Sequence, residues 1–274
     1  MSKIKRKKIG LALGGGGAKG LAHIGVLKVL ERNNIPIDYI AGTSIGAMVG
    51  GYYAASKSVS YVEKMALDSN MSRFASLMFE LTREGGLVRG NKILAYLEKS
   101  LDGIDFSELE IPFAAVATEL NCGETVYFEK KGDVAAAIRA SISYPPVFSP
   151  FKIKNRLFVD GGLSCQVPVK KVFDMGADVV IAVALENDYI FKKREFDKEA
   201  AFGNTFGNTY RVLNSSIKVL VKRLGEYDTK CANVVISPKV GSLRTWMDFG
   251  KSDRIIKIGE DAAKKSIKDI KKLL

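Results

Sequence analysis

The order of apolar runs along the chain predicts an α/β fold with a central, mainly parallel sheet. Near the N-terminus, two short apolar runs, at 9–13 and 39–41, each lead into a helical stretch. Strand, helix, strand and helix in this order form a right-handed βαβ unit, whose strands are parallel. Further buried runs at 179–184 and 234–237 supply more strands for the same sheet.

The first two strand–helix units have clear boundaries. The strand at 9–13 ends in Gly14-Gly15-Gly16-Gly17, and the helix after it, at 18–32, has its apolar residues on one side. Asn33-Asn34 ends that helix, and Pro36 prevents its continuation. The strand at 39–41 then leads through a tight turn into a helix of small residues at 44–55.

The rest of the chain continues the alternation with less regularity. We predict strands at 113–118 and 125–128 around a turn at 121–123, an alanine-rich helix at 133–141, a strand at 156–159, and a last helix at 254–274 whose apolar face carries Ile256, Ala263, Ile267, Ile270 and Leu274. A length of 274 residues without an internal repeat favours a single domain over 1–274. Its motif-bearing core covers about 9–185, and 186–274 supplies the C-terminal strand and helices.

Two segments carry apolar residues at helical spacing without an obvious partner. One is Met71–Leu81, within 71–90, and the other is Gly203–Gly225, within 186–230, where the row is Leu213, Ile217, Leu220 and Leu224. Each is either a helix packed on the core or an amphipathic lid or lipid-facing surface, and the core interpretation is favoured because such rows usually pack inward.

Composition and charge narrow the class of protein. Hydrophobic residues make up 47% of the chain, no apolar run is long enough to span a membrane, and no signal-peptide core follows the basic start, so we expect a cytoplasmic protein. Three widely separated cysteines and a single histidine argue against a disulfide framework and against a metal site. The net charge of +12 suits peripheral contact with an anionic membrane surface, or simple solvation; no nucleic-acid motif accompanies it.

Gly42-Thr43-Ser44-Ile45-Gly46 is the segment most indicative of chemistry. Gly-x-Ser-x-Gly is typical of a nucleophile elbow, a strand-to-helix turn that exposes a serine hydroxyl. Such a serine normally uses a histidine that follows it in the chain. The single histidine, His23, precedes Ser44. Ser44 therefore needs a different base, if the motif is catalytic.

The glycine loop has two interpretations. Gly15-x-Gly17-x-x-Gly20 fits a dinucleotide-binding fingerprint, but Asp38, the acidic candidate, precedes its strand and so lies at the wrong end of the sheet, and Lys19 is not followed by Ser or Thr as in a P-loop. Alternatively, backbone amides at the start of a helix converge on negative charge and form an oxyanion hole facing Ser44. Lys19 faces the same opening or solvent.

Asp160 is the best candidate for the base. It ends an apolar strand and is followed by Gly161 and Gly162, a position from which a carboxylate can reach a cleft at the sheet edge. Asp-Gly-Gly alone usually marks only a turn. A carboxylate is a weak base in water, and burial beside Ser44 would raise its pKa and make it effective.

These blocks together resemble the patatin-like phospholipases, which are lipid acyl hydrolases with a Ser–Asp dyad. The resemblance covers the segments 14–20, 42–47, 140–148 and 160–162, in this order. It implies a three-layer α/β/α fold, Ser44 as nucleophile, Asp160 as base, the amides of Gly15, Gly16 and Gly17 as oxyanion hole, and no metal or other cofactor. Gly14, Lys19, Gly20, Gly42, Gly46, Gly161 and Gly162 would support these motifs. After Asp-Gly-Gly, many relatives carry asparagines where this chain has Ser164-Cys165-Gln166.

The expected activity is hydrolysis of a carboxylic ester of a lipid, such as a phospholipid or lysophospholipid. The alternatives are an acyltransferase or thioesterase with the same dyad, and a nucleotide-binding regulatory protein that uses the glycine loop without catalysis. His23 braces the glycine loop by hydrogen bonding or, less favoured, transfers a proton directly.

Overall fold

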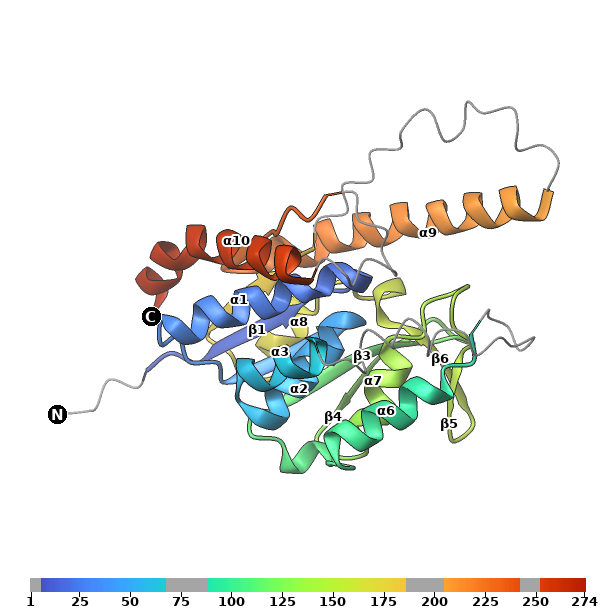
Figure 1. The fold of residues 1–274 in the computed structure, drawn as a ribbon, viewed down its shortest axis with the longest axis horizontal. Coiled ribbons are helices and arrows are strands. Elements are labelled where there is room, and N and C mark those ends of the chain that lie inside the picture. Colours follow the sequence, from blue (N-terminus) through green and yellow to red (C-terminus); the bar gives the residue numbers. More distant parts are fainter. Residues whose placement is uncertain (1–5, 68–87, 186–204, 242–251) are drawn as a thin grey trace.

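The computed structural model describes residues 6–67, 88–185, 205–241 and 252–274 (Figure 1). Eight strands within these ranges form one sheet in the order β5-β6-β3-β2-β1-β7-β8, and β4 also pairs with β3. The strands are β1 (Ile9–Leu13), β2 (Tyr39–Thr43), β3 (Phe113–Glu119), β4 (Thr125–Glu129), β5 (Phe151–Ile153), β6 (Arg156–Asp160), β7 (Val179–Val183) and β8 (Val234–Ile236).

The sheet is mixed, with a parallel centre and an antiparallel margin. Strands β3, β2, β1, β7 and β8 run parallel, whereas β4 and β6 pair antiparallel with β3, and β5 with β6. All residues of β1, β3 and β7 are buried, as expected for strands with helices on both faces. The predicted α/β class with a mainly parallel sheet is therefore confirmed.

Helices cover both faces of the sheet and make three layers. Their bounds are α1 (Leu21–Arg32), α2 (Ile45–Ser56), α3 (Val59–Leu67), α6 (Asn91–Leu101), α7 (Val134–Ser141), α8 (Val169–Asp174), α9 (Thr205–Asp228) and α10 (Ser252–Leu273). The larger core lies where Leu11 and Leu13 of β1 meet α1 and α2. On the opposite face, Ala12 belongs to a smaller core with Val169 and Val172 of α8.

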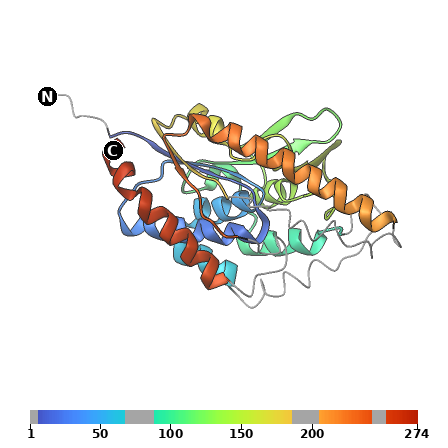
Figure 2. The same ribbon diagram turned by 90° about the horizontal axis from the view of Figure 1, so that it is seen from above.

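Helices α1 and α10 pack directly against each other over much of their length (Figures 1 and 2). Two glycines allow this approach: a Cβ on Gly25 would lie 1.9 Å from the carbonyl oxygen of Ile256, and one on Gly259 would lie 2.0 Å from that of Ala22. The C-terminal helix therefore braces α1, which follows the glycine loop.

Several predicted boundaries shift by one or two residues, and three expectations need correction. The helix expected from Ala18 begins as a 3-10 turn, Gly17–Gly20, before α1. The expected buried strand at 234–237 is an edge strand whose Val235 is exposed, and Leu274, expected on the apolar face of the last helix, is also exposed. The segment Met71–Leu81 lies outside the described residues.

The apolar row of Gly203–Gly225 does not pack inward as favoured. Within α9, Ile217 and Leu224 are half-buried, but Leu213 and Leu220 are exposed. Spacings of four, three and four residues keep this row on one side of the helix. That side lies at the margin of the contact with the protein, so Ile217 and Leu224 are partly covered whereas Leu213 and Leu220 are not. Residues 186–204 of the same predicted region lie outside the described part of the chain.

Candidate active site

The register of three neighbouring strands brings Ser44 and Asp160 together. Thr43 of β2 pairs with Val116 of β3, so Ser44 follows at the level of Ala117. Asp160, the last residue of β6, pairs with that same Ala117 from the other side. The hydroxyl of Ser44 donates a hydrogen bond to Oδ2 of Asp160 over 2.6 Å. Both side chains are buried.

Ser44 has the backbone geometry of a nucleophile elbow. Its φ of 56° and ψ of −125° are strained for a residue with a side chain, and its amide donates to Oγ of Ser141 at the end of α7 (2.8 Å). The turn needs glycine on both sides: a Cβ on Gly42 would lie 2.3 Å from the carbonyl oxygen of Gly46, and one on Gly46 would lie 2.3 Å from that of Leu13. The motif therefore holds the serine between strand and helix.

Asp160 is held by the turn that follows it. Its Oδ1 accepts a hydrogen bond from the amide of Gly162 (2.8 Å), and Gly161 packs so closely that a Cβ there would lie 2.3 Å from the carbonyl oxygen of Val116. Burial raises the pKa of Asp160 to about 6, and the hydrogen bonds from Ser44 and Gly162 oppose that rise. The carboxyl group is therefore ionised near neutral pH yet basic enough to accept a proton.

The glycine loop passes directly over the serine. A Cβ on Gly15 would lie 3.3 Å from Cβ of Ser44. The amide of Gly14 donates to Val183 O (3.0 Å) and that of Gly15 donates to Gln166 O (3.2 Å). Among the described residues, the amides of Gly16 and Gly17 have no hydrogen-bond partner. Gly15, predicted as an oxyanion donor, is thus already engaged, and the candidate donors narrow to the two glycines after it.

His23 braces this loop. Its Nε2 lies 2.8 Å from Gly14 O, to which it can only donate, and the ring is fully buried. Burial lowers the pKa of His23 to about 4, so the ring is neutral. Lys19 is buried too, which excludes the predicted solvent-facing position, and Gly20 leaves room for the side chain of Ile45.

Gln166 is a site residue that the sequence did not single out. Its Nε2 donates to Gly15 O (2.9 Å), its carbonyl oxygen accepts from the amide of Gly15, and its own amide donates to Asp228 of α9 (2.7 Å). A Cβ on Gly162 would lie 2.6 Å from Oε1 of Gln166 and 3.1 Å from Oδ1 of Asp160. Gln166 therefore connects the glycine loop, the Asp-Gly-Gly turn and α9. A single glutamine belongs to no recognisable sequence motif. The one sequence signal that could have identified Gln166 is its position six residues after Asp160.

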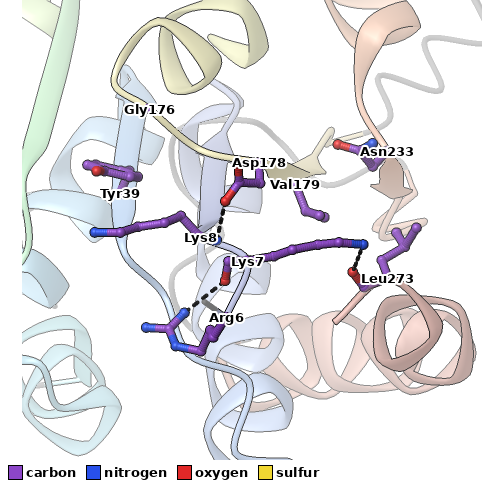
Figure 3. Close-up of a pocket in the computed structure, with 9 residues that line it drawn as sticks. All are labelled: Arg6, Lys7, Lys8, Tyr39, Gly176, Asp178, Val179, Asn233 and Leu273. Atoms are coloured by element: carbon purple, nitrogen blue, oxygen red, sulfur yellow. Dashed lines mark hydrogen bonds between the residues drawn. The ribbon is translucent and has the colours of Figure 1, made fainter. Parts of the chain in front are cut away.

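A separate surface pocket of about 640 Å³ lies at the end of the parallel strands opposite to the candidate active site (Figure 3). It is lined by residues at the amino ends of the parallel strands, including Lys8, Tyr39 and Val179. Two of the three basic side chains that line it are engaged: Arg6 pairs with Asp38 (2.7 Å), and Nζ of Lys7 donates to Leu273 O (2.8 Å). Asp38 is thus an ion-pair residue far from the glycine loop, as its position before β2 indicated.

The described residues contain neither a metal-binding cluster nor a membrane-spanning helix. No group of three or more His, Cys, Asp or Glu side chains there could hold a metal ion. In the same ranges, no helix is both long and apolar enough to cross a membrane.

Comparison with known protein families agrees with the geometry. The sequence model of the family described as patatin-like phospholipase matches residues 11–173, which is more than half of the chain. The chain belongs to this family. The match contains the glycine loop, the elbow and the Asp-Gly-Gly turn, so all three motifs lie in the patatin-like part of the chain.

Individual relatives are similar over part of their own length. An uncharacterised NTE family protein of Mycobacterium tuberculosis is 38% identical over 178 residues, which cover 65% of this chain and 49% of that protein. A lysophospholipase of Neurospora crassa is 28% identical over 92% of this chain but only 18% of its own length, and mouse patatin-like phospholipase domain-containing protein 6 is 28% identical over 92% of this chain and 20% of its own. This patatin-like chain therefore spans about half or less of these relatives.

Among solved structures, VipD of Legionella pneumophila has a similar fold. The TM-score is 0.57 at 14% identity, over 97% of this chain and 67% of that one. The likeness supports the fold alone.

Proposed function

We propose that this patatin-like chain hydrolyses carboxylic ester bonds of lipids, with Ser44 as nucleophile and Asp160 as general base. The observation that carries the proposal is the 2.6 Å hydrogen bond between the two buried side chains, one on an elbow and the other with its pKa raised to about 6. Phospholipids or lysophospholipids are the favoured substrates, because a relative over 92% of this chain is named a lysophospholipase.

The first step forms an acyl-enzyme. Oγ of Ser44 attacks the ester carbonyl carbon while Oδ2 of Asp160 accepts the hydroxyl proton, and the protonated Asp160 then donates this proton to the departing alcohol oxygen. His23 takes no part in the transfer, because its Nε2 proton is committed to Gly14 O and its pKa is lowered to about 4. Its role is to hold the loop in place.

The negative charge that develops on the carbonyl oxygen needs donors. The amides of Gly16 and Gly17 have no partner among the described residues, and they belong to the loop that passes over Ser44. Two preorganised backbone donors of this kind stabilise an oxyanion without reorganisation, and loss of one typically costs about 10²–10³-fold in kcat. In the second step, Asp160 removes a proton from a water molecule, whose oxygen attacks the carbonyl carbon of the acyl-enzyme. The bond from this carbon to Oγ of Ser44 then breaks, Asp160 returns the proton to Oγ, and the fatty acid is released.

Two substitutions test the pair. Ser44→Ala and Asp160→Asn should each lower kcat for a lipid ester by at least about 10³-fold, because the nucleophile and base act as a unit. A fluorophosphonate probe should label the parent chain at Ser44 and leave Ser44→Ala unlabelled. Ser149→Ala is the matched control, since this buried hydroxyl has no hydrogen-bond partner within the described ranges and no role in the mechanism. A folded Ser44→Ala protein that retains turnover would contradict the proposal.

Product analysis separates hydrolysis from the related reactions. With water alone, a hydrolase releases free fatty acid, whereas an acyltransferase accumulates a new ester when an alcohol acceptor is added. A faster reaction with an acyl thioester than with the oxygen ester of the same chain would indicate a thioesterase. Tight nucleotide binding without probe labelling would favour a regulatory protein instead.

A further inference from the structure

Helix α9 exposes a row of large apolar side chains. We call Val212, Leu213, Val219, Leu220 and Tyr227 the outer row; their exposed fractions are 51, 58, 46, 69 and 69%. Spacings of seven and eight residues place them along one side of the helix. Of the nine large hydrophobic residues exposed within the described ranges, these five share one helix, and the other four are scattered. Such a concentration marks an interaction surface.

This helix lies next to the candidate active site. At its C-terminal end, Asp228 accepts hydrogen bonds from the amides of Gln166 (2.7 Å) and Val167 (3.0 Å). Asn214, earlier in the helix, accepts one from the hydroxyl of Tyr144 (3.2 Å), which lies in the turn after α7. The inward side of α9 is thus attached at two points near the Ser44–Asp160 pair. Among the helices of the described residues, none lies over α9 in the view of Figure 2.

Basic residues accompany the outer row. Arg223 lies on the same side of the helix with 81% of its side chain exposed, and Lys222 is adjacent with 54% exposed. Glu226 is within 4.0 Å of both and offsets one of these charges. Lys230 follows, with Nζ 5.4 Å from the ring centre of Tyr227. The surface is therefore apolar with a net positive charge, on a chain whose total is +12.

We propose that the outer row of α9 docks onto an anionic lipid surface, with its apolar side chains in the acyl boundary and Lys222, Arg223 and Lys230 at the headgroups. Apolar side chains flanked by lysine and arginine are the chemistry of interfacial helices. A second copy of the chain is a poorer occupant, because a symmetric contact would bring the same cations together. This proposal rests on the proposed lipid ester hydrolysis and deepens it, because docking of α9 would bring a substrate in the bilayer to the candidate active site beside this helix.

The experiment uses the full chain with Ser44→Ala, so that binding is measured without turnover. Cosedimentation compares vesicles of phosphatidylcholine with vesicles that also contain phosphatidylglycerol. We expect binding to require phosphatidylglycerol. The double change Leu213→Ser/Leu220→Ser should weaken it about tenfold or more. Lys222→Gln/Arg223→Gln should weaken it by several-fold to about tenfold, and less so in high salt.

Matched controls change the same residue types elsewhere. Leu120→Ser removes a leucine that is 47% exposed outside α9, and Lys170→Gln removes a lysine that is 83% exposed on α8. Both should bind as the parent does, and circular dichroism with the unfolding midpoint should show that every variant is folded. Binding by the α9 variants equal to that of the controls would overturn the proposal, as would a monomer–dimer shift caused by the leucine changes without vesicles. Binding is measured throughout on the Ser44→Ala chain and so does not depend on turnover. An inactive parent enzyme would therefore refute the proposed function without affecting the vesicle-binding result.

Discussion

Asp160 and His23 lie fully buried with pKa values shifted in opposite directions, to about 6 and about 4. Between about pH 4 and pH 6, the folded state holds more protons on Asp160 than the unfolded state does, so its contribution to stability falls as pH rises. Up to about pH 6.5, the folded state holds fewer protons on His23 than the unfolded state does, so the contribution of His23 to stability rises with pH. These opposite pH dependences of the free energy of unfolding largely cancel, so the parent chain should show little net change in stability over this range.

Asp160→Asn should remove the pH-dependent contribution of Asp160 and leave that of His23. The variant and the parent should be equally stable near pH 4, where the carboxyl group is protonated. Above pH 7, the variant should be more stable by about 3 kcal/mol, because it no longer buries a charge. Urea unfolding at a series of pH values measures the difference. Asp174→Asn, at an exposed aspartate paired with Lys170, should show no such pH-dependent gain. A variant less stable than the parent at pH 8 would contradict the argument.

Gln166 gives a second prediction, on the pH dependence of ester hydrolysis. If Asp160 is the base, kcat/KM should rise with pH and level off above a midpoint near 6. Gln166→Glu places a second carboxylate beside that of Asp160, because the oxygens of both side chains approach Gly162. It should move the midpoint upward by about one pH unit.

His23→Gln serves as the comparison, since an amide can still donate to Gly14 O and the midpoint should stay near 6. If the midpoint vanishes with His23→Gln, or if Gln166→Glu leaves it unchanged, the assignment of Asp160 as the base is contradicted. Rates are measured on a soluble short-chain ester, so that lipid contact does not enter the profile.

At the scale of whole elements, the crossing of α1 and α10 tests how the glycine loop is supported. Gly259→Ala would place a methyl group 2.0 Å from the carbonyl oxygen of Ala22, so the helices must separate. We expect a loss of about 1–3 kcal/mol in the free energy of unfolding, or more, because both sides of the contact are backbone. Lys265→Ala, at an exposed position of the same helix, should cost little. Thermal and urea unfolding of both variants measure the difference, and equal stability would show that the crossing can relax.

The elements that the sequence predicted are those with a strong local signal. The strands β1, β2, β3 and β7 are uninterrupted apolar runs, and α1 is marked by its glycine loop before it and by Asn33 and Pro36 after it. The helices α3, α6 and α8 were not predicted. Helix α3 packs on α1 and α2, and α8 packs on the sheet, so their few apolar residues become significant only in that packing. Helix α6 carries Ile93, Leu97 and Leu101 at helical spacing, so the sequence did hold a signal for it. The burial of α9 was predicted wrongly because periodicity shows that a helix has an apolar side, but not what lies against that side.

Over the whole molecule, the sequence suggested that Ser44 and Asp160, 116 positions apart in the chain, are partners, and strand pairing explains why they meet. That pairing is a property of the sheet: Asp160 reaches Ser44 only because β6 runs antiparallel beside β3. The engagement of Gly15 and the place of Gln166 could not be predicted, because both depend on a contact between the glycine loop and the segment after Asp160.

The net charge of +12 yields a last prediction, on the behaviour of the whole chain at a lipid surface. Between ~0.1 M and ~1 M salt, the Debye length falls from about 10 Å to about 3 Å, which screens attraction to an anionic bilayer. Hydrolysis of an ester embedded in phosphatidylglycerol-containing vesicles should therefore slow by about tenfold or more. The rate on a soluble neutral ester should change little, because the Ser44–Asp160 pair is buried and its hydrogen bond is short-range. The ratio of the two rates at each salt concentration is the measurement. A ratio that stays constant would mean that long-range charge does not bring the chain to its substrate.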